Sequence, residues 1–272
     1  MPRTRPSLGG ASAPCPLPPV SPILYEHPFN ERVRTLLRLD DLFERLDFFG
    51  AQAHRLEHHV ALVTLFELID VASRADLKAD LLQELERQRQ TLASFQDAPG
   101  VSGAMLTRVM TEIDDAWQQL SANVTRGGQA LRDNEWLMSI RSRTNIPGGT
   151  SEFDLPSYHA WLHRPVEARR ADIEAWSASF RPLHEALRIV LGLLRQSGQP
   201  AAHTAQQGSF QQTLSGKQYQ MLRLRMDSSL GAVPEISANK YQLWIRFTTH
   251  ASEARPRPFE GDVPFELTLC NL

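Results

Sequence analysis

The chain has 272 residues and a mass of 30.7 kDa, a length that suits two domains better than one or three. Hydrophobic residues make up 42% of it, charged residues 22% and aromatic residues 8%, which excludes a disordered chain, a fibre or a membrane span. The 29 basic and 31 acidic residues leave a formal net charge of −2 at pH 7, which argues against binding polyanions over the whole surface.

Charge is unevenly distributed along the chain. Residues 23–125 carry 10 basic and 17 acidic residues, whereas residues 126–272 carry 17 basic and 14 acidic residues. The C-terminal half therefore has room for a local site that recognises an acidic ligand. The two cysteines, Cys15 and Cys270, form no spacing that would hold zinc, and so few cysteines are typical of a reducing, cytoplasmic setting.

Residues 1–22 hold seven of the 18 prolines and few large apolar side chains. Such a segment cannot form a core, so we expect a disordered or polyproline-like arm. The prolines also interrupt the apolar stretch that a signal peptide needs. No later segment approaches the roughly 18 apolar residues of a membrane helix, and we expect neither export nor membrane insertion.

Helices dominate the next hundred residues. After a possible short strand at residues 23–25, apolar residues at three- and four-residue steps predict an amphipathic helix at 30–49, with Asn30 as its N-cap. Residues 51–71 predict a central helix because apolar residues crowd more than one face. Residues 75–95 predict another, and we expect a bend near 72–74.

A stop signal at residues 97–100, Asp-Ala-Pro-Gly, separates this helix from the next one, predicted at 102–120. Two helices joined by so short a turn pack antiparallel, which predicts a helical hairpin. The inward side chains expected on the second helix are Leu106, Val109, Met110, Ile113, Trp117 and Leu120.

The pattern changes after residue 129. Residues 131–143 are compatible with a helix, a turn follows at 146–150, and partial alternation predicts strand or extended chain in part of 153–163. A helix is expected at 166–196 with an interruption at Pro182. The polar residues that follow it, as far as Gln207, resemble a linker.

The last third has the character of β-structure, with strands predicted at 209–214, 219–226, 241–248 and 264–269. Alternation places Arg223 and Arg225 on one face of their strand, and Trp244 and Arg246 on one face of theirs. If these strands are antiparallel neighbours, Arg223, Arg225 and Arg246 line the same exposed side.

These elements predict an α+β fold with an elongated N-terminal α-helical domain containing a helical hairpin, and a C-terminal antiparallel β-strand domain. We assign residues 1–22 to the arm and 23–132 to the helical domain, with the helix at 166–197 packing on it. Residues 133–165 and 205–272 are assigned to the β-strand domain.

No catalytic motif is evident: the sequence contains no GxSxG, P-loop, HExxH or GxGxxG string. His54 and His58 have the i, i+4 spacing of a metal pair, but satisfied or solvated histidines are the favoured interpretation. His159 and His163 are also four apart, yet an extended segment would keep them remote from one another. The residues alone therefore predict a non-enzymatic binding or scaffolding protein without metal or cofactor, whose arginine-lined sheet is the candidate surface.

A series of short strings runs in fixed order from residue 23 to residue 272. They are LYEHPFNE at 24–31 with Arg34, Leu37 and Arg38 behind it, LLQELERQ at 81–88, PGV at 99–101, IPGG at 146–149, FDLP at 153–156, WLH at 161–163, DS at 227–228, IS at 236–237, Lys240, and IRF at 245–247. In these strings the chain resembles ZapD, a family of FtsZ-associated bacterial cell-division proteins.

The resemblance implies a cytoplasmic homodimer with an α-helical and a β-strand domain, and neither catalysis nor a cofactor. Members bind the short C-terminal peptide of the tubulin-like GTPase FtsZ. A dimer that presents two such sites cross-links and bundles FtsZ filaments, which stabilises the Z ring at midcell.

The resemblance also implies a basic peptide pocket in the β-strand domain, to which Arg246 and Lys240 correspond. The sequence departs from the family pattern at Gln242 and Glu135, where arginine is expected. We therefore expect other arginines to complete the pocket, with Arg223, Arg225, Arg141 and Arg143 as candidates. Tyr241, Trp244 or Phe247 would supply apolar contact.

A different class of function remains open. An arginine face with Trp244 and Tyr241 as stacking platforms would also suit a nucleic-acid-binding module. The net charge of −2 and the acidic helical half argue against that alternative.

Overall fold

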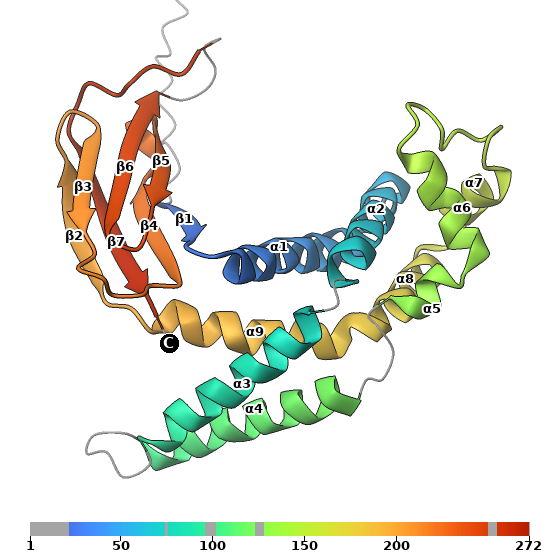
Figure 1. Ribbon diagram of the computed structural model, residues 1–272. Coiled ribbons are helices and arrows are strands. Elements are labelled where there is room, and N and C mark those ends of the chain that lie inside the picture. Colours follow the sequence, from blue (N-terminus) through green and yellow to red (C-terminus); the bar gives the residue numbers. More distant parts are fainter. Residues whose placement is uncertain (1–21, 74–75, 96–101, 123–127, 250–254, 272) are drawn as a thin grey trace, which may run out of the picture. The chain divides into compact units, whose positions relative to one another are not determined.

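The computed structural model describes residues 22–73, 76–95, 102–122, 128–249 and 255–271 (Figure 1). The chain forms two compact units. We call the described residues within 26–200, 216–223 and 268–272 the helical unit, and those within 1–25, 201–215 and 224–267 the sheet unit. The expected arm, apart from Pro22, and the expected turn at 97–100 lie outside the described residues.

Nine α-helices and one 3₁₀ turn, η1, are present in the described part of the helical unit, and a second 3₁₀ turn, η2, belongs to the sheet unit. Their bounds are α1 Glu31–Ala51, α2 Arg55–Ala72, α3 Leu77–Ala93, α4 Gly103–Ala122, α5 Gln129–Arg132, α6 Glu135–Thr144, α7 Pro156–Leu162, α8 Val166–Ser177, η1 Ala178–Phe180, α9 Arg181–Gln196 and η2 Ser228–Leu230. None of the described helices is both long enough and apolar enough to cross a membrane.

Helix α1 begins where the sequence predicts. The side chain of Asn30 accepts a hydrogen bond from the backbone N–H of Val33 at 2.8 Å, which satisfies one of the free donors of the first turn. The predicted interruption at Pro182 is also confirmed, because η1 separates α8 from α9 and the proline lies in the first turn of α9, where its missing N–H costs nothing.

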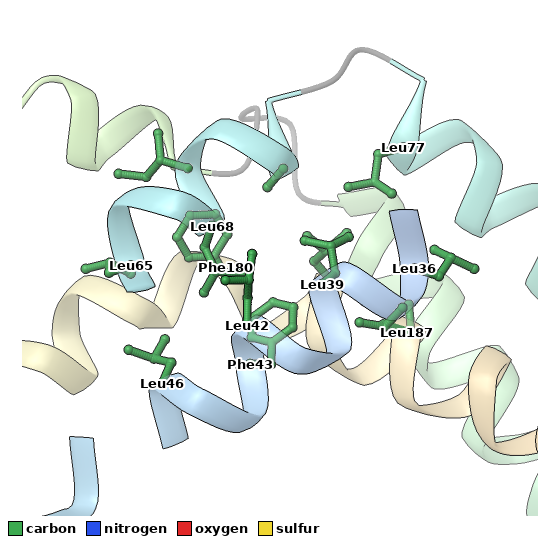
Figure 2. Packing of buried hydrophobic residues seen from close by; sticks show 14 of the residues in the cluster. Leu36, Leu39, Leu42, Phe43, Leu46, Leu65, Leu68, Leu77, Phe180 and Leu187 are labelled. Atoms are coloured by element: carbon green, nitrogen blue, oxygen red, sulfur yellow. The ribbon is translucent and has the colours of Figure 1, made fainter. Parts of the chain in front are cut away.

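The core of the helical unit is built from the apolar stripe of α1 and the side chains that face it (Figure 2). Leucines recur on α1 at three- and four-residue steps, and helices α2 and α9 cover them. The buried residues labelled in Figure 2 are Leu36, Leu39, Leu42, Phe43, Leu46, Leu65, Leu68, Leu77, Phe180 and Leu187. Each such side chain contributes about 1.5–3 kcal/mol when fully buried.

Helices α3 and α4 form the predicted antiparallel hairpin. Lys78, near the start of α3, donates to the carbonyl of Ser121, near the end of α4, at 3.1 Å. The prediction that Trp117 points inward is wrong, because its side chain is 41% exposed. Ala116 is buried instead, and one residue step turns the helix by about 100°, which carries Trp117 away from the contact face.

Two predictions for residues 133–165 are wrong. The stretch expected to contain extended chain forms helix α7, which has Pro156 in its first turn. Its buried residues are Tyr158 and Trp161, which are three apart, so the helical period prevails over the partial alternation. Residues 133–165 form helices α6 and α7 within the helical unit and not part of a β-strand domain.

Seven strands form two sheets in the described part of the chain, so the α+β class is confirmed. The four-stranded sheet has the order β1-β4-β7-β2 and the three-stranded sheet the order β3-β6-β5. The strands are β1 Pro22–Pro28, β2 Pro200–Ala205, β3 Ser209–Thr213, β4 Met221–Asp227, β5 Ala232–Ala238, β6 Gln242–Thr249 and β7 Val263–Cys270.

Strands β2 and β5 were not predicted. Strand β2 occupies part of the expected linker, and in its PAAHTA sequence Thr204 is the single residue of the β-branched and aromatic types that mark most strands. Strand β5 contains Pro234, which a central strand would exclude. The structure accommodates Pro234 because β5 lies at the edge of its sheet, where an N–H is not required on the outer side.

The two sheets of the sheet unit meet through aromatic side chains. Phe210 of β3 and Phe247 of β6 have ring centroids 5.1 Å and 5.5 Å from that of Phe265 on β7. One face of the three-stranded sheet is thus covered within the unit. The side chains of β6 that alternate with the buried Leu243, Ile245 and Phe247 point to the opposite face.

Candidate functional site

The uncovered side of the three-stranded sheet presents a compact set of polar and aromatic side chains. Strand pairing places Trp244 between Gln211 of β3 and Ser237 of β5, and Arg246 between Ser209 of β3 and Glu235 of β5. Directly paired residues point to the same side of a sheet. We call these six residues the Trp244 face: Ser209, Gln211, Glu235, Ser237, Trp244 and Arg246.

The alternation of β6 sets which side chains reach this face. Leu243, Ile245 and Phe247 are buried, whereas Trp244 is 37% exposed and Arg246 is exposed. The predicted orientation of Trp244 and Arg246 is therefore confirmed. Phe247 is excluded as an apolar contact for a ligand, because its side chain is wholly buried.

The charged pair on the Trp244 face has no ionic or hydrogen-bond partner in the part of the chain that the structure describes. Arg246 and Glu235 are direct cross-strand partners, which places their Cβ atoms about 4.5–5.5 Å apart. Neither side chain makes an ion pair or a hydrogen bond with any residue that the structure describes, nor does the indole N–H of Trp244. The guanidinium, the carboxylate and the indole donor are all available to a ligand.

The surface around these groups is hollowed. The Trp244 face and its neighbours line an open depression of about 650 Å³ within the sheet unit. The other lining residues are Gln206, Phe210, Ile236 and Ile245. A depression of this size, with an aromatic side chain beside separate charges, suits an extended peptide segment.

Lys240 lies in the turn between β5 and β6. The side chain of Asn239 accepts hydrogen bonds from the backbone N–H groups of Tyr241 and Gln242 at 2.8 and 2.9 Å, which fixes the turn. The ammonium of Lys240 lies 4.8 Å from the centroid of the Tyr241 ring, a cation–π contact. Lys240 and Arg246 therefore belong to the same hairpin.

Arg223 does not share a face with Arg246, because β4 belongs to the four-stranded sheet and β6 to the other. Its guanidinium donates to Glu26 at 3.1 Å. Glu26 also accepts from Arg195 at 2.7 Å, and Arg195 bridges onward to Asp40 at 2.7 Å. The half-buried position and these bonds give Arg223 a structural role.

Arg225 is also separated from Arg246. It is exposed on β4 and lines a different hollow of the sheet unit, together with the acidic residues Asp227 and Glu266. The expectation that three arginines gather on one sheet is therefore wrong. A single arginine remains on the Trp244 face, which weakens the case for a nucleic-acid-binding surface.

Arg141 and Arg143 lie in α6 of the helical unit. Arg141 pairs with Asp70, and Arg143 approaches Asp154 at 3.9 Å. Glu135 begins the same helix, where a carboxylate suits the positive end of the helix dipole. Both arginines thus have acidic partners of their own.

Glu235, which sequence reasoning missed, is the most informative member of the face. Nothing in the local sequence marks it, since its strand was not predicted. The available signal was the alternation of the polar, exposed Glu235 and Ser237 with the half-buried Pro234, Ile236 and Ala238, which the proline obscured.

The histidines have structural partners. His54 caps α2 through a reciprocal capping box with Glu57, and the Nε2 of His58 lies 2.7 Å from the carbonyl of Gln52. The expected separation of His159 and His163 is wrong, because α7 brings their ring centroids to 4.4 Å. No group of three or more His, Cys, Asp or Glu residues is arranged to hold a metal within the residues described.

Comparison with known proteins identifies consistent relatives. The model of the family described as "ZapD: Cell division protein" matches residues 37–246. Relatives named "Cell division protein ZapD" from Janthinobacterium sp. (strain Marseille), Ralstonia pickettii (strain 12J) and Ralstonia nicotianae (strain ATCC BAA-1114 / GMI1000) are each 58% identical to this chain. The similarity extends over 249, 250 and 250 residues, which is 92% of this chain and 99% of each relative.

Proposed function

The chain belongs to the ZapD family of cell division proteins, and from this premise we propose that it binds the C-terminal peptide of FtsZ through the Trp244 face. As a dimer with two such sites, it cross-links FtsZ filaments and stabilises the Z ring. It acts in the cytoplasm at midcell and performs no catalysis. ZapD is a cell division family and not a known family of enzymes.

The observation that supports this proposal is the unengaged state of the Trp244 face. An arginine free of internal ion pairs attracts a carboxylate, and an exposed indole beside it contacts an apolar side chain. Lys240, in the same hairpin, adds a second positive charge. We leave Arg223, Arg141 and Arg143 outside the proposed site because each has an acidic partner.

Weak individual sites are sufficient for bundling. When one site of a dimer has bound, the second meets the neighbouring filament at a high effective concentration. A modest affinity per peptide therefore yields strong cross-linking, provided that both sites are intact.

The test is co-sedimentation with polymerised FtsZ. Arg246→Glu is expected to reduce co-sedimentation at least tenfold, because it replaces attraction of the peptide carboxylate by repulsion. Arg225→Glu is the matched control, since it makes the same charge change on an exposed strand residue of the other sheet, and it is expected to co-sediment as the wild type does.

A parallel arm uses FtsZ that lacks its C-terminal peptide, to which the wild-type protein is expected not to bind. Equal pelleting by intact and truncated FtsZ would contradict tail docking. Tight binding of mixed single-stranded DNA and RNA without FtsZ co-sedimentation would instead support the nucleic-acid alternative.

A further inference from the structure

We propose that the Trp244 face is selective for a peptide that carries an acidic and a basic side chain close together, with Glu235 binding the basic one while Arg246 binds the acidic one. This inference rests on the proposed function and deepens it. Glu235 thereby becomes a residue that determines specificity, in addition to the positive charges that draw in an acidic peptide.

The register of β5 and β6 brings the two charged side chains together. Glu235 and Arg246 are directly paired across β5 and β6, so their side chains leave the same face about 5 Å apart. An exposed acid and an exposed base at such a spacing often join in an ion pair. Here neither has an ionic partner among the described residues, and each is left to bind a group of opposite charge.

Glu235 imposes a penalty on the binding of a purely acidic ligand. An acidic group of the ligand about 5 Å from the Glu235 carboxylate in water is repelled enough to weaken binding of the ligand about fourfold. A site that served only to attract acidic groups would be better with a neutral residue at this position. A basic group on the ligand removes the penalty, because it neutralises the carboxylate while the acidic group reaches Arg246.

The other four residues of the Trp244 face carry no charge. Ser209 flanks Arg246 on the β3 side, and Gln211 and Ser237 flank Trp244. The only charges on the Trp244 face are therefore those of Arg246 and Glu235. An acidic side chain can reach Arg246 from the Ser209 side, a basic one can reach Glu235 at the outer edge, and an apolar side chain lies on Trp244 about 7 Å along β6.

The proposal is tested by titrating labelled FtsZ C-terminal peptide into wild-type protein and Glu235→Gln. A second peptide has every Lys and Arg replaced by Gln. The substitution is nearly isosteric and lies at an exposed position, so folding is expected to be unaffected, which circular dichroism checks. The matched control is Glu266→Gln, which removes a carboxylate from β7 in the other sheet.

Glu235→Gln is expected to bind the native peptide about two- to fivefold more weakly than the wild type does, and to bind the neutralised peptide as well as or better than the wild type. Glu266→Gln is expected to match the wild type for both peptides. Unchanged or tighter binding of the native peptide by Glu235→Gln would overturn the inference, since Glu235 would then be neutral or a competitor for Arg246.

Different results would contradict the proposed function and the role of Glu235. If wild-type protein does not bind the native peptide at all, the proposed function and this inference are both contradicted. If the wild type binds and Arg246→Glu abolishes binding, but Glu235→Gln does not weaken it, the proposed function stands and the role of Glu235 is rejected.

Discussion

Gly128 occupies a position that only glycine fills without strain. It precedes α5 with a φ of +79°, and a Cβ atom built there would lie 2.9 Å from the ring of Phe180 and 3.2 Å from Ile69. Gly128→Ala therefore combines an unfavourable backbone conformation with overpacking of the core. We expect the free energy of unfolding to fall by about 2–4 kcal/mol, measured by urea denaturation.

Gly192 is a glycine at which the same substitution is expected to change the free energy of unfolding in the opposite direction. It lies within α9, and a Cβ there would meet nothing within 4 Å. Gly192→Ala is expected to raise the free energy of unfolding by about 0.5–1 kcal/mol, because alanine favours the helix and loses less backbone entropy. A similar loss of stability in both variants would contradict the account of Gly128.

At the scale of elements, α4 buries one narrow stripe and exposes the rest. Ile113 is wholly buried, whereas Met105 is 63% exposed on the same helix. Ile113→Ala is expected to lower the free energy of unfolding by about 2–5 kcal/mol through the cavity that it leaves. Met105→Ala is the matched control and is expected to change it by about 0.5 kcal/mol or less. Equal losses in urea denaturation would show that the contact face of α4 is misplaced.

At the corner between α1 and α2, side chains of another helix, α8, donate hydrogen bonds to backbone carbonyls. Helix α1 has no basic residue in its last turn, and two arginines of α8 donate to the carbonyls at and just beyond its C-terminus. Arg170 donates to the carbonyls of Ala51 at 2.6 Å and Gln52 at 3.2 Å, and Arg169 donates to that of Ala53 at 2.9 Å. Two guanidinium groups thus face the negative end of the α1 dipole.

At the scale of the whole molecule, one buried and two half-buried histidines make stability depend on pH. Burial is the main cause that lowers the pKa of His27, His58 and His59 in the helical unit. For His58, Arg169 and Arg170 lower the pKa further, while Glu57 and the bond to Gln52 oppose them. All three rings therefore favour the neutral form in the folded protein.

The unfolded chain binds a proton on each histidine near its ordinary pKa of about 6.5, whereas the folded protein resists protonation. The contribution of these groups to stability is present above that pH and is lost as the pH falls below it. We expect the urea midpoint to fall from pH 7.5 to pH 5.5, and to fall less in His58→Gln, which keeps a donor for the Gln52 carbonyl but does not titrate. An identical pH dependence in both proteins would exclude His58 as a contributor.

Much of the fold was predictable because its signals are local. The cap at Asn30, the helix break at Pro182 and the alternation along β6 each depend on residues within one or two turns or a single strand. The failures occurred where a local pattern was ambiguous, as in α7, or weak, as in β2 and β5. There, packing against the rest of the chain decided the outcome.

Part of the candidate site was also predictable from local signals, and part of it was not. Alternation along β6 was enough to point Trp244 and Arg246 to one side. It did not reveal that Glu235 stands opposite Arg246, because strand neighbours are set by the sheet as a whole. Arg223 looked equally available, but its partner Glu26 lies 197 residues away in the sequence.

The sequence by itself determined the α+β class, the family and the exposed faces of its most regular elements, since periodicity and short motifs are properties of neighbouring residues. Only the tertiary structure decided which strands share a sheet, which arginines form ion pairs within the protein and which charge lies beside Arg246. Those outcomes depend on contacts between segments that are far apart in the chain and become neighbours only when the chain folds and its hydrophobic cores form.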